Sequence, residues 1–202
     1  MNPKELPCQR TLLDGTAVTM RLQETTDAKA LLEFYRALPE QDRQYLDDDV
    51  ATPQWISRFI QRSDFNTRYP IVAEVGGRII GHAWLIRTPH GWMSHVGQLR
   101  FAVARDQQRK GLGSALVREI LRIAETVGLD LMTARVLEDQ VSVLRTFEKL
   151  GFKREAVLRG YVRDVQGHRR DLVILGNDIS QIWQAMELLV SDAPPTREML
   201  GG

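Results

Sequence analysis

This chain of 202 residues contains a single cysteine, Cys8, so it cannot form an internal disulfide. Such cysteine usage is typical of a reducing compartment. No apolar run is long enough to cross a bilayer, and the beginning of the chain, Met1 to Arg10, lacks the apolar core of a secretory signal. The net charge of +1 shows no overall basic bias toward nucleic acid. We therefore expect a soluble, cytoplasmic protein that binds neither membranes nor nucleic acid.

The sequence also lacks a pattern of metal ligands. Neither the cysteine nor the histidines have metal-ligand spacing, and no bound metal is expected. The four histidines are His82, His90, His95 and His168. Hydrophobic residues at 43% and charged residues at 26% are ordinary values for a globular protein. A chain of this length suits one domain with a substantial core.

Two common nucleotide-binding motifs are missing as well. A P-loop requires GxxxxGK[ST], which does not occur in the chain. A dinucleotide-binding loop requires GxGxxG, but the third position after Gly111-Leu112-Gly113 is Leu116. Both absences weaken a nucleotide-binding interpretation.

What the chain has around these glycines is a β-rich run over 96–104, then a polar turn that contains Gly111 and Gly113. Apolar residues at helical spacing follow the turn, which predicts a strand, a glycine loop and a helix in succession. These apolar residues are Leu112, Leu116, Ile120, Ala124 and Val127.

This order of elements predicts an anion site. The first turn of a helix leaves backbone N–H groups without partners and carries the positive end of the helix dipole, so phosphate fits there. Gly111 and Gly113 let a ligand approach the main chain closely, and Arg109 and Lys110 add positive charge. A pyrophosphate is the expected ligand, although a glycine pair is also common in ordinary turns.

The segment Gln108 to Gly113 resembles the [QR]xxGx[GA] signature of the GNAT superfamily, the acetyl-CoA-dependent N-acyltransferases. Further on, Asp139 to Phe152 resembles the next block of that superfamily, a helix that ends in a YEKLGF-like sequence. The two blocks occur in the order and separation of the family. The resemblance implies an α/β fold, with acetyl-CoA inserted where a mixed sheet opens between its fourth and fifth strands.

The rest of the chain supports about seven strands flanked by helices. Strands are expected over 18–22, 71–75, 78–86, 95–104, 129–137, 156–163 and 170–175. Helices are expected over 28–38, after Thr52-Pro53, and over 112–127, 141–150 and 179–190. Gly76-Gly77 predicts a two-residue hairpin, and Asp14-Gly15 predicts a turn. We assign residues 1–176 to one GNAT-like domain and 177–202 to an extra C-terminal helix with a loose tail, where the helix packs on the domain or meets a second subunit in a homodimer.

The resemblance also implies which residues bind the cofactor. The main chain of Phe101, Ala102 and Val103 would align the pantetheine arm as an added strand. Residues in and next to the glycine loop would hold the pyrophosphate: Gln108, Arg109, Lys110, Gly111, Leu112, Gly113 and Ser114. Gln140 stands where the family commonly has a cofactor-contacting asparagine, and Phe147 aligns with a tyrosine that often protonates the departing thiolate.

The catalytic residues depart from the family pattern. Gln98 aligns with a glutamate that serves as base in many members, and an amide can orient water but cannot accept the proton. His95 is the first choice for a substitute base, ahead of His82 and Glu74. Phenylalanine at 147 has no proton to give, and Tyr161 is a replacement donor. For each of these residues an ordinary packing or surface role is the alternative.

The leading prediction is an N-acetyltransferase that moves the acetyl group of acetyl-CoA to a primary amine of a small molecule or a protein, by direct attack in a ternary complex. Asp47-Asp48-Asp49 would attract a cationic amine, or it is a solvated loop. Gln98 and Phe147 support the alternative of an acyl-CoA-binding sensor that has lost catalysis. Nucleic-acid binding through Arg109 and Lys110 is a third hypothesis, which the near-neutral net charge disfavours.

Overall fold

The computed structural model describes residues 6–43, 46, 49–164 and 166–191. In this part of the chain the sheet has eight strands, in the order β1-β2-β3-β4-β5-β6-β8-β7. The strands are β1 (Cys8–Thr11), β2 (Ala17–Leu22), β3 (Arg68–Val75), β4 (Arg78–Arg87), β5 (Val96–Val103), β6 (Leu131–Leu137), β7 (Lys153–Arg163) and β8 (Arg169–Asp178). The helices are α1 (Ala28–Ala37), α2 (Glu40–Arg43), α3 (Pro53–Gln61), α4 (Leu112–Thr126), α5 (Val141–Lys149) and α6 (Ile179–Ser191), with short 3-10 turns η1 (Thr25–Asp27) and η2 (Arg105–Gln107).

The predicted mixed sheet is confirmed, and it gains one strand. The additional strand is β1, which pairs antiparallel with β2. Four residues are too few for a hydrophobic period to be recognised, so the sequence pattern did not predict it. The predicted turn at Asp14-Gly15 is the connection between these two strands.

The sheet divides at β5 and β6, which run parallel and pair only from Val96 and Leu131 to Gln98 and Thr133. Beyond this point the two strands separate, as the family resemblance implied. Gly97 stands within the short paired region, and a Cβ atom there would lie 2.7 Å from a methyl carbon of Leu85. Glycine therefore allows close packing just before the strands separate.

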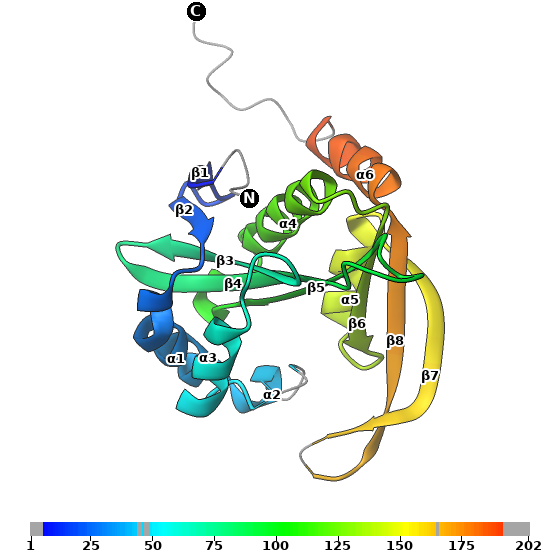
Figure 1. Cartoon of the computed structure of the whole chain (residues 1–202), viewed down its shortest axis with the longest axis horizontal. Helices are drawn as coiled ribbons and strands as arrows, with labels where there is room; N and C mark the ends of the chain where they lie inside the picture. The colour runs from blue at the N-terminus through cyan, green and yellow to red at the C-terminus, as the bar shows by residue number, and fades with distance from the viewer. Residues whose placement is uncertain (1–5, 44–45, 47–48, 165, 192–202) are drawn as a thin grey trace, which may run out of the picture.

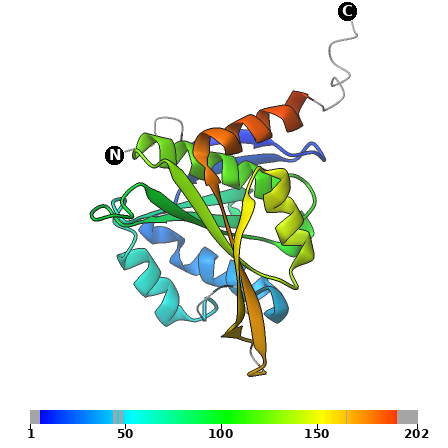
Figure 2. The same ribbon diagram turned by 90° about the vertical axis from the view of Figure 1, so that its right-hand side faces the viewer.

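Helices cover both faces of the half of the sheet built from β3, β4 and β5. Helix α4 lies on one face, and α1 and α3 lie on the other (Figure 1). The turned view shows the same layers, with α6 near α4 (Figure 2). Side chains on β4 alternate between the layers, since Gly81 faces Leu116 of α4 whereas His82 contacts Tyr35 of α1.

Two local predictions are confirmed in detail. The hydroxyl oxygen of Thr52 accepts a hydrogen bond from the N–H of Trp55 at 3.3 Å, and Pro53 opens α3. Gly76 and Gly77 connect β3 to β4 with φ angles of +56° and +79°, which glycine adopts without strain. These contacts begin the helix and close the hairpin where the sequence placed them.

The C-terminal helix α6 packs on the same core as the sheet. Ile179, Ile182 and Met186 are buried members of this core. A Cβ atom at Gly151 would lie 2.8 Å from the Cβ of Ala185, so the helix approaches the chain closely there. The predicted loose tail after Ser191 lies outside the described residues. In the part of the chain that is described, no helix is both long and apolar enough to span a membrane.

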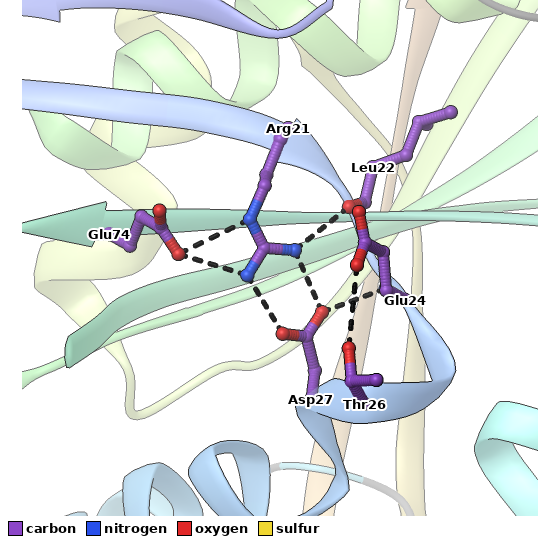
Figure 3. Close-up of polar contacts among 6 residues, drawn as sticks. All are labelled: Arg21, Leu22, Glu24, Thr26, Asp27 and Glu74. Atoms are coloured by element: carbon purple, nitrogen blue, oxygen red, sulfur yellow. Dashed lines mark hydrogen bonds and ion pairs between the residues drawn. The ribbon is translucent and has the colours of Figure 1, made fainter. Parts of the chain in front are cut away.

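A cluster of charges joins β2, β3 and the start of α1 (Figure 3). The guanidinium of Arg21 donates two hydrogen bonds of 2.8 Å to the carboxylate of Asp27, and it donates to Glu74 at 2.9 and 3.2 Å. Burial alone would raise the pKa of Asp27, but hydrogen bonds from Arg21 and from the Glu24 N–H hold that pKa below its usual value. The bonds to Asp27, ahead of those to Glu74, raise the pKa of Arg21.

Candidate functional site

A cavity of about 730 Å³ opens where β5 and β6 separate. Its lining comes from β5, the glycine loop, the start of α4, β6 and α5, together with the region after α1. The lining residues for which no site role was predicted are Leu38, Asp42, Leu46, Leu99, Arg100, Arg135, Val136, Asp139, Val141, Ser142, Val143 and Thr146. Those from Asp139 to Thr146 lie in the second family block, whereas Leu38, Asp42 and Leu46 come from a part of the chain that no motif marked.

The glycine loop has an unusual backbone on the wall of this cavity. Arg109 has a φ angle of +62° and Gly111 has one of +87°. The positive φ angle costs glycine nothing, but at an arginine it costs about 1 kcal/mol. Helix α4 begins directly after Gly111. Its first backbone N–H groups have no partners within the helix, so this end of the cavity can bind an anion.

Most of the predicted cofactor residues meet at this cavity. The members that line it are Phe101, Ala102, Val103, Gln108, Arg109, Gly111, Gly113, Ser114, Gln140 and Phe147. The edge of β5 over Phe101 to Val103 faces the gap left by β6, so its backbone is available to an extended ligand. A Cβ atom at Gly113 would lie 3.3 Å from the ring of Phe101, which makes this a crowded position.

Two predicted cofactor residues have other contacts. Lys110 is not one of the described residues that line the cavity, and its ammonium group lies 3.0 Å from the carboxylate of Asp14. Its Nζ also donates to the side-chain oxygen of Gln107 at 3.3 Å. Leu112 is buried and packs toward Gly81 of β4, where it belongs to the core.

Gln140, the N-cap of α5, and Phe147, in the last turn of α5, line the cavity. The side-chain oxygen of Gln140 accepts a hydrogen bond from the N–H of Leu137 at 3.2 Å, so its amide nitrogen is the group it can offer a ligand. The ring of Phe147 is buried, with its centroid 5.6 Å from that of Phe101 and 5.0 Å from that of Phe152. These contacts hold the two sides of the cavity together through aromatic packing.

The three predicted catalytic residues lie in different places. Gln98 is half-buried and is the last residue of β5 that pairs with β6, so it lies at the inner end of the gap. His95 is exposed, three residues earlier, and its carbonyl oxygen accepts hydrogen bonds from Asp130 and Leu131. Tyr161 is 66% exposed on β7, which β8 separates from β6. None of Gln98, His95 and Tyr161 is among the described residues that line the cavity, and Gln98 differs from the other two in lying next to Leu99, which does line it.

His82, a second choice for the base, is fully buried among aromatic side chains of α1, α3 and β4. Its Nδ1 lies 2.6 Å from the hydroxyl of Tyr35, and its Nε2 has no hydrogen-bond partner among the described residues. Burial lowers the pKa of His82 to about 3. The imidazole is therefore neutral near pH 7 and a poor proton acceptor.

Glu74, the other alternative base, accepts hydrogen bonds from Arg21 (Figure 3). Of the predicted acidic loop, Asp49 is exposed, and Asp47 and Asp48 lie outside the described residues. The nearby carboxylate on the cavity is Asp42 of α2, which is half-buried. It stands in a helix of four residues, too short to have been recognised from the sequence.

Comparison with known proteins supports the family resemblance of the sequence. A model of the acetyltransferase (GNAT) family matches residues 29–152. YwnH of Bacillus subtilis (strain 168), whose name assigns it provisionally to phosphinothricin acetylation, is 26% identical over 166 residues, 81% of this chain and 100% of its own. L-amino acid N-acetyltransferase AaaT of Escherichia coli (strain K12) is 25% identical over 148 residues, 71% of this chain and 88% of its own.

A solved structure with a similar fold is that of spermidine N-acetyltransferase from Vibrio cholerae, in complex with CoA and spermine. It matches with a TM-score of 0.70 at 17% sequence identity, over 82% of this chain and 98% of its own. At this identity the match concerns the fold.

Proposed function

The chain belongs to the acetyltransferase (GNAT) family of acyltransferases, and we propose that it transfers the acetyl group of acetyl-CoA to a primary amine of a small molecule or a protein. The observation that carries this proposal is the cavity between β5 and β6, with the start of α4 on its wall. The family uses acetyl-CoA, and the cavity combines an anion site with an unpaired strand edge, the two features that a pyrophosphate and a pantetheine arm require.

The glycine loop would bind the pyrophosphate through the first N–H groups of α4, with Arg109 as the positively charged side chain of the loop on the cavity. The main chain of Phe101, Ala102 and Val103 would bind the pantetheine arm. Gln140 would donate from its amide nitrogen, and the ring of Phe147 would contact the arm. Acetyl-CoA would thus lie with its thioester beside the unpaired edge of β5.

The transfer requires a neutral amine, whereas an alkyl ammonium group like that of lysine has a pKa of about 10.4. The amine nitrogen forms a bond to the thioester carbon, the carbon–sulfur bond breaks, and the thiolate leaves with the electron pair. Gln98 would orient the water that takes the proton from nitrogen, because it lies where the strands separate. A thiol pKa of about 8.5 lets the thiolate leave without an acid at Phe147.

The main catalytic effect would be positioning. Amine and thioester held together in one cavity react as an intramolecular pair, and a backbone N–H on the unpaired edge of β5 would polarise the carbonyl oxygen. Each effect amounts to several kcal/mol in other enzymes. The acceptor would enter on the side of Leu38, Asp42 and Leu46, where the carboxylate favours a cationic amine. Relatives named for an L-amino acid or for phosphinothricin support a small acceptor.

Thiol release from acetyl-CoA, measured across L-amino acids, polyamines and lysine peptides, tests this function. We expect release with at least one amine, and initial-rate lines that intersect, as direct attack in a ternary complex requires. Binding of CoA without thiol release from any amine would favour the sensor alternative, which Gln98 and Phe147 support.

A variant in the glycine loop tests the location of the cofactor. Gly113→Trp places a large ring at a position where even a Cβ atom lies 3.3 Å from Phe101, so CoA binding should be lost. Gly113→Ala is the matched control, and a small shift of the Phe101 ring accommodates its methyl group. If the tryptophan variant bound CoA as tightly as the wild type, the assignment of this loop would be wrong.

A further inference from the structure

The turn between β1 and β2 contacts the glycine loop from outside the cavity. The N–H of Leu13 donates a hydrogen bond of 3.0 Å to the carbonyl oxygen of Lys110. The carboxylate of Asp14 lies 3.0 Å from the Lys110 ammonium group. The Leu13 side chain lies 3.3 Å from the place where a Cβ atom at Gly111 would stand. Three contacts of different kinds therefore reach two adjacent residues of the loop.

The turn is itself well anchored. Two nitrogens of Arg10 on β1 donate to one carboxylate oxygen of Glu119 on α4, at 2.7 and 3.0 Å, and Glu119 is almost fully buried. Figure 1 shows β1 and β2 beside this helix. Within the turn, the N–H of Thr16 donates to Asp14 at 3.1 Å. Hydrogen bonding with the Thr16 side chain, then with Lys110 and with the Thr16 N–H, lowers the pKa of Asp14 to about 2, so the carboxylate is ionised in ordinary buffers.

The loop needs such support because of its backbone. Lys110 lies between Arg109 and Gly111, which both have positive φ angles. An arginine persists in this conformation only where its surroundings hold it. Lys110 is the residue that Leu13 and Asp14 contact, through its carbonyl oxygen and its side chain. If these contacts were lost, the loop could relax and turn its N–H groups away from the anion site.

We infer that Leu13 and Asp14 are positioning residues of the acetyl-CoA site, which act by holding Lys110 so that the glycine loop keeps its anion-binding shape. In this arrangement Lys110 does not bind the pyrophosphate directly. The inference rests on the proposed function, since it concerns the loop to which that proposal assigns the pyrophosphate.

Lys110 either holds the loop through Asp14 or binds the pyrophosphate directly. A double-mutant cycle between Asp14 and Lys110 distinguishes these two roles. Asp14→Asn keeps an oxygen that accepts from the Thr16 N–H but loses the charge that attracts the ammonium group. Lys110→Met removes the same ion pair from the other side. If the pair holds the loop, each change should raise the Kd for CoA about threefold, and the double variant should raise it no more than either single one.

Direct binding of the pyrophosphate by Lys110 gives the opposite pattern. Asp14→Asn would then leave CoA binding unchanged or make it tighter, because it removes a negative charge and frees the lysine. Lys110→Met would weaken CoA binding by the same factor in the wild type and in the Asp14→Asn variant. Either result overturns the inference.

Steady-state kinetics give a second readout. The KM for acetyl-CoA should rise about threefold in Asp14→Asn, while kcat and the KM for the amine stay unchanged, a split that a general loss of folded protein would not produce. Asp106→Asn is the matched control, since Asp106 also precedes the loop and pairs with Arg78 of β4 at 2.9 Å. It should leave the Kd for CoA within about 1.5-fold of the wild-type value.

Failure of the proposed function has its own signature. If the wild type did not bind CoA, or if Gly113→Trp bound it normally, the proposed function and this inference would both be wrong. If the wild type bound CoA and Gly113→Trp did not, but the cycle were additive, only the inference that the contact between Asp14 and Lys110 holds the loop would be wrong.

Discussion

Acidification should destabilise this protein through one buried histidine, His82. Its imidazole is fully buried, and burial lowers its pKa from 6.5 to about 3, with Asp27 raising the pKa and Arg68 lowering it to smaller extents. Below pH 6.5 the unfolded chain takes up a proton at this residue while the folded chain does not. The unfolded state therefore binds more protons in this range, and stability must fall as pH falls.

The loss of stability can be calculated from the linkage between proton binding at His82 and unfolding. Each pH unit between 6.5 and about 3 lowers the free energy of unfolding by about 1.4 kcal/mol for a single group. From pH 7.5 to pH 5.0 the loss should be about 2 kcal/mol. Asp27, whose pKa is lowered from 3.8, gives stability that is fully present above 3.8 and is lost as pH falls below that value. Its contribution therefore does not vary between pH 5.0 and 7.5.

Urea unfolding at pH 7.5, 6.0 and 5.0 measures this loss. The wild type is compared with His82→Gln, whose side-chain oxygen can still accept from the hydroxyl of Tyr35, 2.6 Å from the present Nδ1. The variant should start less stable and lose about 2 kcal/mol less than the wild type over the same range. His90→Gln, at an exposed histidine, should keep the wild-type dependence. Parallel curves for the wild type and His82→Gln would refute the reasoning.

Four further outcomes are expected. Gln98→Glu should raise kcat/KM near pH 7 about tenfold or more, because a carboxylate accepts the proton that an amide only guides to water, and a pH–rate profile tests this. His95→Ala and Tyr161→Phe should leave kcat within about twofold, since both residues lie away from the cavity, and a fall of about tenfold or more would restore their predicted roles. Phe147→Tyr should raise kcat by less than about threefold, measured by thiol release, because the thiolate leaves without an acid. Arg21→Met should lower the free energy of urea unfolding by about 2–3 kcal/mol, since the buried carboxylate of Asp27 is left without its charged partner.

The elements with a strong period or a specific cap could be predicted from the sequence. Helix α3 begins at Pro53 because Thr52 caps it, and the hairpin at Gly76-Gly77 needs two positive φ angles. Such signals are local, since they depend on residues a few positions apart. The short elements β1 and α2 have too few residues to show a hydrophobic period. Strand β1 is positioned by its pairing with β2, and α2 lies at the cavity.

The candidate site was predictable where it is made of backbone. The glycine loop and the edge of β5 lie at the cavity as the motif implied, because strand, loop and helix order already determines where the N–H groups point. Side chains were less predictable. Lys110 pairs with Asp14, and His82 is buried against Tyr35, through contacts between residues that the sequence places far apart. No local sequence pattern predicts these contacts.

The family resemblance implies that Gln98 and Phe147 each stand where many members have a group that transfers protons. Gln98 still ends the paired part of β5, and Phe147 still packs its ring on Phe101, 5.6 Å away between centroids. Glutamine is close in size to glutamate, and phenylalanine lacks only the hydroxyl of tyrosine, so we expect the shape of the site to be kept. Loss of an acid and a base lowers the rate of a reaction but not the affinity of a shaped cavity. An acceptor bound tightly beside the thioester compensates best for that loss, because proximity needs no proton transfer. We therefore expect this chain to be selective among amines, with high kcat/KM for few acceptors and thiol release near background for the rest.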